Sequence, residues 1–324
     1  MLTEQQAYLL LSSAAELPKR VVDGQFLRLE TGERHTAIQC SDFNLLARYV
    51  AGQDITPVLR QRQACGFNSL RVWTIYAIQG IGYSPVSDAL YAAIPGFVRQ
   101  CAGFGLYVDV TAFTGPYVFM SDDVAKITHW ERLLAAATFA PSLTLELGNE
   151  IDHPANRDLP MFRLRRPTTV LASSGSMTAD RWPAPEDSWD LLEYHTNDLD
   201  EWWRKAGHNA FELASSYGHP CIANENTRFP DRDGNTTHAF DAAAGAALLC
   251  AGACFHSVHG KTSELWDGRE LECAIAWAAG ARSVPLEFQT GQYHHRKDLE
   301  GPGILRAYDR TLPAGQSFVV EIRA

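Results

Sequence analysis

Two glutamates, Glu150 and Glu225, are the residues of this sequence best placed to do chemistry. Each follows an asparagine. Glu150 comes three residues after the largely apolar run LTLEL (143–147), and Glu225 ends the run CIANE (221–225). If these runs are strands of a parallel α/β barrel, their ends deliver polar residues to one mouth of the barrel. Two carboxylates that face each other there can divide a reaction between them. One protonates a leaving oxygen, while the other attacks the carbon or activates water, as glycoside hydrolysis requires.

Three further polar residues lie in runs of the same kind. Arg71 is inside SLRVW (69–73), and Tyr194 and His195 end LLEYH (191–195). A guanidinium close to a carboxylate lowers the pKa of that carboxylate. We therefore expect Arg71 to keep one of the two glutamates ionised, and Tyr194 or His195 to line the same mouth.

The elements that must position these residues recur along the chain. Short apolar runs alternate with stretches of helical pattern at intervals close to the length of one βα unit. Several runs are apolar on both faces, which is typical of buried parallel strands. The eight expected strands are 36–40, 69–73, 106–111, 143–147, 168–173, 191–195, 221–225 and 253–257.

Helices are expected between these strands, over 55–66, 88–105, 126–139, 197–218, 240–252 and 268–281. Gly66, Gly105 and Gly218 stand between a helix and the next strand, as left-handed C-caps do. Eight alternating units favour a closed (β/α)₈ TIM barrel over a doubly wound sheet, which would need a glycine-rich loop after its first strand. We expect one catalytic domain over 1–324, with an N-terminal helix and hairpin in 1–35 and a C-terminal hairpin in 303–324.

The motifs GFNSLRVW (66–73), LELGNE (145–150), EYH (193–195) and NENTRFP (224–230) resemble those of the clan A glycoside hydrolases, whose glutamates lie on barrel strands four and seven. The resemblance implies a retaining enzyme that cleaves β-linked glycosides by double displacement. It implies that Glu150 is the acid/base and Glu225 the nucleophile. It also implies that Asn149 binds the sugar 2-hydroxyl and that Arg71 keeps Glu225 ionised.

A wider set of residues is expected to bind the sugar. Aromatic rings stack on the apolar faces of sugars, and aromatic residues are frequent near the expected strand ends. The eighth strand offers Phe255 and His256 where the resemblance leads one to look for a tryptophan. The full set of expected substrate-binding residues is Arg71, Trp73, Asn149, His153, Trp182, Tyr194, His195, Phe255 and His256.

Other kinds of site are not favoured. His256 and His259 lack a third ligand at a metal-binding spacing, and the sequence contains neither HExxH nor GxSxG. We therefore expect no metal and no organic cofactor. Glu146 lies inside its strand and is more simply an ion-pair partner in the barrel wall.

Bulk composition limits the partners. The net charge of −10 provides no basic stripe for nucleic acid, and no apolar run has membrane-spanning length. The N-terminal stretch lacks the basic start of a signal peptide, and seven scattered cysteines suggest buried thiols, so we expect a cytoplasmic protein. The expected partner is an oligosaccharide or glycoside. Transglycosylation at the same site, or an inactive carbohydrate-binding barrel, remain the alternatives.

Overall fold

The protein is described by a computed structural model that covers most of the chain. The described residues are 16–78, 81–83, 86–120, 122–151, 154–156, 158–160, 163–177, 189–195, 201–225, 227–284, 293–294, 304–311 and 317–323. The N-terminal helix was expected over 7–20, and residues 7–15 lie outside these ranges. Residues 16–19 are not helical and Arg20 begins a strand, so the expectation is wrong for the described part.

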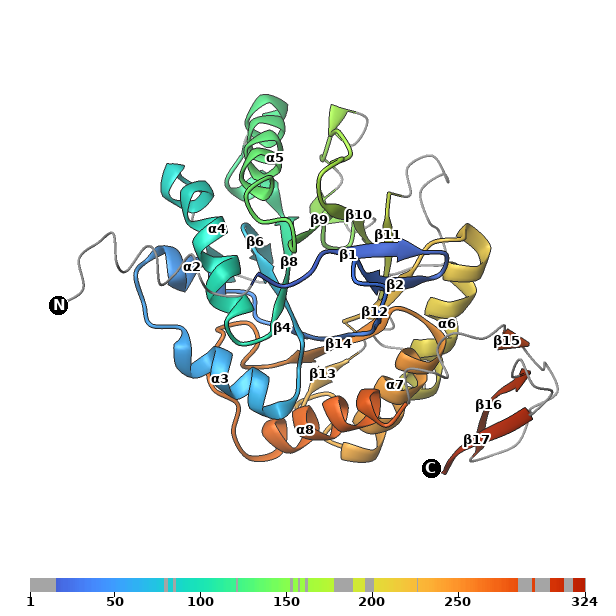
Figure 1. Cartoon of the computed structure of the whole chain (residues 1–324). Coiled ribbons are helices and arrows are strands. Elements are labelled where there is room, and N and C mark those ends of the chain that lie inside the picture. Colours follow the sequence, from blue (N-terminus) through green and yellow to red (C-terminus); the bar gives the residue numbers. More distant parts are fainter. Residues whose placement is uncertain are drawn as a thin grey trace.

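Eight parallel strands form a closed barrel (Figure 1). Each strand pairs with the next one along the chain, and the last strand pairs with both the first and the seventh, which closes the ring. All eight strands expected from the sequence are confirmed within a few residues at each end. They are β4 (Ala37–Ser41), β5 (Ser69–Trp73), β8 (Tyr107–Phe113), β9 (Thr144–Gly148), β10 (Leu171–Met177), β11 (Leu191–His195), β12 (Cys221–Asn224) and β14 (Gly252–Ser257).

Helices surround this barrel on the outside (Figure 1). Gly66 and Gly218 adopt left-handed conformations at the ends of α3 and α6, as expected. Gly105 is also left-handed, with a φ of 69°, but the residue that caps α4 is Gly103. The described helices are α2 (Leu45–Val50), α3 (Thr56–Cys65), α4 (Asp88–Ala102), α5 (Asp123–Ala137), α6 (Trp202–Tyr217), α7 (Thr236–Leu249) and α8 (Gly268–Arg282). Short elements in the connections are β6 (Tyr76–Ile78), β7 (Ile81–Tyr83), η1 (Pro116–Val118), η2 (Pro154–Asn156) and β13 (Arg228–Phe229).

The two faces of the barrel strands differ in polarity. Side chains that face the helices, such as Leu70 and Val72 of β5, belong to the main apolar core. Side chains that face the interior are largely polar and bond across it, as Arg71 does with Glu146. The expectation that several strands are apolar on both faces is therefore wrong for the interior, where hydrogen bonds compensate the buried polar groups.

The amino-terminal end of the barrel is closed by an antiparallel sheet of β1 (Arg20–Asp23), β2 (Phe26–Leu29) and β3 (Arg34–His35). Leu27 is fully buried against residues of the barrel strands. Arg20 donates to Asp109 of β8 at 2.6 Å and also to Thr144 of β9. This sheet confirms the hairpin expected before the first strand.

Three further expectations concern the C-terminal hairpin, the cysteines and membrane-spanning segments. A second antiparallel sheet contains β15 (Tyr293–His294), β16 (Ile304–Thr311) and β17 (Ser317–Arg323), which confirms the C-terminal hairpin. All seven cysteines are free and buried. Within the described ranges, no helix has the length and apolarity needed to cross a membrane.

The contact between α6 and α7 offers a test of this packing with a matched control. A Cβ atom at Gly207 of α6 would lie 2.6 Å from the backbone of Gly245 of α7, whereas a Cβ atom at Gly245 would meet nothing within 4 Å. We expect Gly207→Ala to lower the free energy of unfolding by about 1–3 kcal/mol, because two backbones must separate. Gly245→Ala should raise it by up to about 1 kcal/mol, through helix propensity. Urea denaturation measures both, and equal effects would contradict this packing.

Candidate active site

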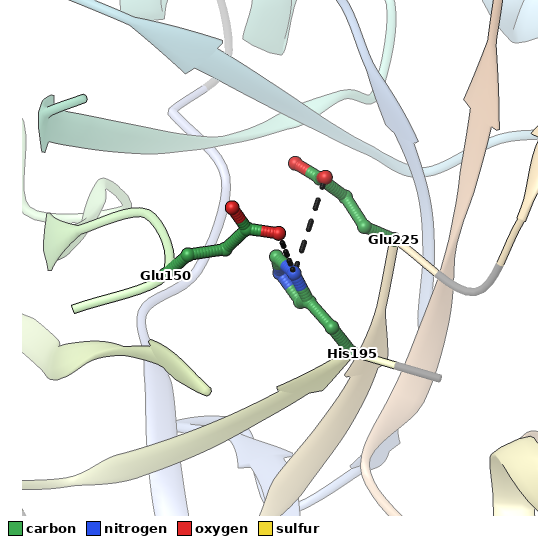
Figure 2. Close-up of side chains that lie close together, drawn as sticks. All are labelled: Glu150, His195 and Glu225. Atoms are coloured by element: carbon green, nitrogen blue, oxygen red, sulfur yellow. Dashed lines mark hydrogen bonds and ion pairs between the residues drawn. The ribbon is translucent and has the colours of Figure 1, made fainter. Parts of the chain in front are cut away.

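Glu150 and Glu225 face each other at the carboxyl-terminal end of the barrel (Figure 2). They follow β9 and β12, and a carboxylate oxygen of one lies within 4.8 Å of a carboxylate oxygen of the other. Both residues have positive φ angles, 50° and 41°, which non-glycine residues adopt at a cost. This backbone conformation turns the chain sharply at each strand end, and surrounding contacts must hold it.

Arg71 is the centre of those contacts. Its Nη1 donates to Oε1 of Glu225 at 2.7 Å, and its Nη2 donates to Oδ1 of Asn149 at 2.8 Å. Its Nε and Nη2 both donate to Glu146, at 2.6–2.8 Å. The contact expected between Arg71 and Glu225 is thus present, and Glu146 is the ion-pair partner that the sequence suggested. One fully buried guanidinium therefore links β5 to β9 and to the residues that follow β9 and β12.

The charges around Glu225 favour its ionised form. Burial alone would raise the pKa of this carboxyl, but electrostatic attraction to His195, His256 and Arg71 outweighs burial. The hydrogen bond from Arg71 adds to that attraction, and together they hold the pKa of Glu225 at about 2. Glu225 is therefore a carboxylate at neutral pH.

A third carboxyl, Glu193 of β11, has the opposite tendency. Burial and the neighbouring Glu146 raise its pKa well above the ordinary value, against the attraction of Arg71. Its Oε2 accepts a hydrogen bond from Asn224 and lies 3.8 Å from Nε of Arg71. Arg71 thus has more acidic neighbours than one guanidinium can neutralise, and Glu193 is the one whose protonation is favoured.

The loop that carries Glu150 is fixed by a residue that the sequence did not single out. Asn156 of η2 is buried, and its Nδ2 donates to the carbonyl oxygens of both Asn149 and Glu150. Its Oδ1 accepts from the backbone N–H of Gly115, in the loop after β8. Asn156 therefore secures the left-handed turn at Glu150 and connects it to the neighbouring loop after β8.

Two histidines reach the same region from β11 and β14. Nδ1 of His195 lies 3.2 Å from Oε1 of Glu150 and 4.0 Å from Oε2 of Glu225 (Figure 2). His256 interacts electrostatically with Glu225, and its ring stacks on that of Phe43. Both of these expected site residues therefore lie beside the glutamates.

Tyr194 and Phe255 do not reach the site, so these two predictions are wrong. The Tyr194 hydroxyl accepts a hydrogen bond from Asn209 of α6, and Phe255 packs against Trp266 and Trp277 in the apolar core. Successive residues of a strand point to opposite faces, so His195 and His256 take the inward positions and their neighbours face the helices.

The other expected aromatic residues have different outcomes. Trp73 is fully buried next to Arg71, whose Cζ lies 4.4 Å from the ring centre, so it supports the guanidinium rather than exposing a ring. His153 and Trp182 lie outside the described residues. Tyr76, one of the aromatic residues near the expected strand ends, is buried on Phe43, and burial together with the charges of Glu225 and Glu150 raises its pKa.

The site also contains atoms that could serve as metal ligands. Glu150, His195 and Glu225 are the three donors, and one donor atom of each lies within 4.8 Å of the others. These atoms are, however, already engaged in hydrogen bonds and ion pairs within the protein. The His195 nitrogen that would bind a metal already bonds Glu150, and the guanidinium of Arg71 contacts Glu225. A cation there would be repelled by Arg71.

The low pKa of Glu225 predicts a pH-dependent contribution to stability. A lowered pKa stabilises the folded protein above the ordinary value of 4.5, and this stabilisation is lost as the pH falls toward 2. The shift corresponds to about 3 kcal/mol. Between pH 6 and pH 3, urea denaturation should show a smaller loss of stability in Glu225→Gln than in the unmodified protein. Glu131→Gln, on the exposed side of α5, is the control. Equal losses in Glu225→Gln and the unmodified protein would contradict the assignment.

Comparison with known proteins shows a similarity of fold. The sequence matches no family model and no curated protein. Among solved structures, a putative glycoside hydrolase from Bacteroides vulgatus aligns with a TM-score of 0.61 and 14% identity, over 76% of this chain and 55% of its own. This chain thus spans little more than half the length of that protein.

Two further structures are similar. GH5_18 from Streptomyces cattleya, in complex with GlcNAc, has a TM-score of 0.56 and 12% identity, over 82% of this chain and 83% of its own. The exo-beta-1,4-mannosidase Op5Man5 from Opitutaceae bacterium strain TAV5 has a TM-score of 0.56 and 13% identity, over 87% of this chain and 67% of its own. The barrel fold expected from the resemblance to clan A glycoside hydrolases is confirmed.

Proposed function

We propose that this chain is a retaining glycoside hydrolase. The observation that carries the proposal is the approach of Glu150 and Glu225 to within 4.8 Å at the barrel mouth. Retaining glycosidases have carboxyl groups about 5–5.5 Å apart, whereas inverting enzymes need about 6.5–9.5 Å to admit a water molecule. The similar folds of several glycoside hydrolases support the same reaction.

The surroundings of the two glutamates assign their roles. Glu225 is ionised and held by Arg71 through Oε1, which leaves Oε2 to attack the anomeric carbon. Glu150 gives its proton to the glycosidic oxygen as the bond between this oxygen and the anomeric carbon breaks. The electron pair of the broken bond stays on the leaving oxygen. The sugar is then an ester of Glu225.

The second step reverses these roles. Glu150, now a carboxylate, takes a proton from a water molecule, and the water oxygen attacks the anomeric carbon. The bond to Glu225 breaks, and its electron pair returns to the carboxylate that Arg71 stabilises. Two inversions at one carbon give net retention.

The substrate is an oligosaccharide or other glycoside with a β linkage. The mannosidase and the GlcNAc complex among the similar structures support a sugar ligand. Arg71 occupies Oδ1 of Asn149, so the amide can present Nδ2 toward the sugar 2-hydroxyl. No metal or organic cofactor takes part in these steps.

Transglycosylation would use the same site, since only the acceptor in the second step differs. An inactive carbohydrate-binding barrel would need neither the ionised Glu225 nor its bond to Arg71, so these features favour an enzyme.

Single substitutions distinguish the two roles. Glu150→Ala should lower kcat/KM for glycosides with poor leaving groups by about 100-fold or more, because they need a proton donor. Glycosides of acidic phenols should form the glycosyl–enzyme almost normally, and azide should then give a β-glycosyl azide with retention. Glu225→Ala should abolish hydrolysis of every substrate. Added azide should then restore turnover and give the inverted product.

The stereochemistry of the azide products is read by nuclear magnetic resonance. The matched control is Glu131→Ala on the exposed side of α5, which should leave both steps unchanged. An inverted azide product from the Glu150 variant would mean that Glu150 is the nucleophile and Glu225 the acid/base. If the unmodified protein hydrolyses no aryl β-glycoside, the proposed function itself fails.

A further inference from the structure

His195 has two different environments at its two ring nitrogens. It is about 1% exposed, and Nδ1 faces carboxylate oxygens of both Glu150 and Glu225. Nε2 is also buried, and no hydrogen-bond partner for it is found among the described residues. A nitrogen that faces carboxylates is stabilised as N–H, whereas a buried N–H without an acceptor is destabilised. Nδ1 is therefore the nitrogen that carries the proton.

The proton on Nδ1 has a consequence for Glu150. At 3.2 Å, Oε1 of Glu150 accepts the hydrogen bond from His195, while the other oxygen points away from the ring (Figure 2). A proton on Oε1 would face the N–H of His195, donor against donor. The only escape would be to move the histidine proton to Nε2, where the described residues provide no acceptor.

We propose that His195 is a positioning residue that selects which oxygen of Glu150 carries the transferable proton. This inference rests on the proposed function and deepens it. Oε1 of Glu150 accepts the hydrogen bond from Nδ1–H of His195. The acidic proton therefore resides on Oε2, the oxygen directed away from the histidine. In the second step, Oε2 is the oxygen that takes the proton from water.

The alternative is that His195 acts on Glu225, which its Nδ1 approaches at 4.0 Å. This distance is too long for a hydrogen bond. The other oxygen of Glu225 is already bonded to Arg71. The two possibilities predict different kinetics. Impairing Glu150 slows substrates with poor leaving groups more than substrates with good ones, whereas impairing Glu225 slows both kinds.

The first experiment compares His195→Leu with His195→Asn. Asparagine places an N–H donor close to the position of Nδ1, and leucine places a methyl group there. With poor leaving groups, we expect leucine to lower kcat/KM by about 10- to 100-fold and asparagine to restore most of the loss. With dinitrophenyl glycosides, the first step should change by less than about threefold in both variants. Thermal unfolding checks that both variants fold.

A double-mutant cycle gives the second readout. In the Glu150→Ala background, adding His195→Leu should cause almost no further loss, because the residue it positions is gone. If the full loss persists there, or if dinitrophenyl glycosides lose as much as poor leaving groups do, His195 acts elsewhere and the proposal is overturned.

A third readout needs no activity, so it separates this proposal from the proposed function. Nuclear magnetic resonance of protein labelled with ¹⁵N-histidine should show a protonated Nδ1 that is absent from His195→Leu. Its proton resonance should shift in Glu150→Gln much more than in Glu225→Gln. A proton found on Nε2, or a larger shift in Glu225→Gln, would refute the assignment even in a protein that hydrolyses nothing.

Discussion

The buried guanidinium of Arg71 is the interaction on which the site depends. It bonds Glu146 inside β9, Asn149 after β9 and Glu225 after β12, all within 2.6–2.8 Å. Removing one partner of a buried ion pair leaves an uncompensated charge, which costs about 3–5 kcal/mol. The same group therefore stabilises the barrel interior and keeps the proposed nucleophile ionised, and substitution of Arg71 would confound the two effects.

The backbone supports what the guanidinium orders. Both glutamates lie in left-handed turns, which non-glycine residues maintain only when their surroundings fix them. Asn156 fixes the turn at Glu150 from the loop after β9, and Arg71 fixes the carboxylate of Glu225. The apolar core lies outside the barrel, so the strands can present polar side chains inward without weakening the contacts with the helices. The barrel thus holds the carboxyl groups of Glu150 and Glu225 close together at its mouth.

The sequence predicted the strands better than their faces. Each strand is recognisable in the sequence as an apolar run. Because the strands of a parallel barrel end at one mouth, the position of a residue in its run was enough to place Glu150, Glu225, Arg71 and His195 in the site. Tyr194 and Phe255 were misplaced because a shift of one residue reverses the face to which a side chain points. Apolar neighbours do not show which of the two faces is the inner one. Asn156 comes from a connection between strands, whose path follows from packing rather than from local pattern. The ion pairs of Arg71 and Glu146 were expected from the sequence, but the polar character of the interior as a whole was not, because a polar residue inside a strand does not reveal its partners.

The most direct test of the central claim is to trap the intermediate. A 2-deoxy-2-fluoro-β-glycosyl fluoride slows both steps but leaves the first one faster, so the glycosyl–enzyme accumulates. Intact mass spectrometry should show one added fluorosugar per chain, and peptide mapping should place it on Glu225. Attachment to Glu150 would contradict the roles assigned here. Turnover of β-glycosides with inverted product and no trapped species would contradict the double displacement itself.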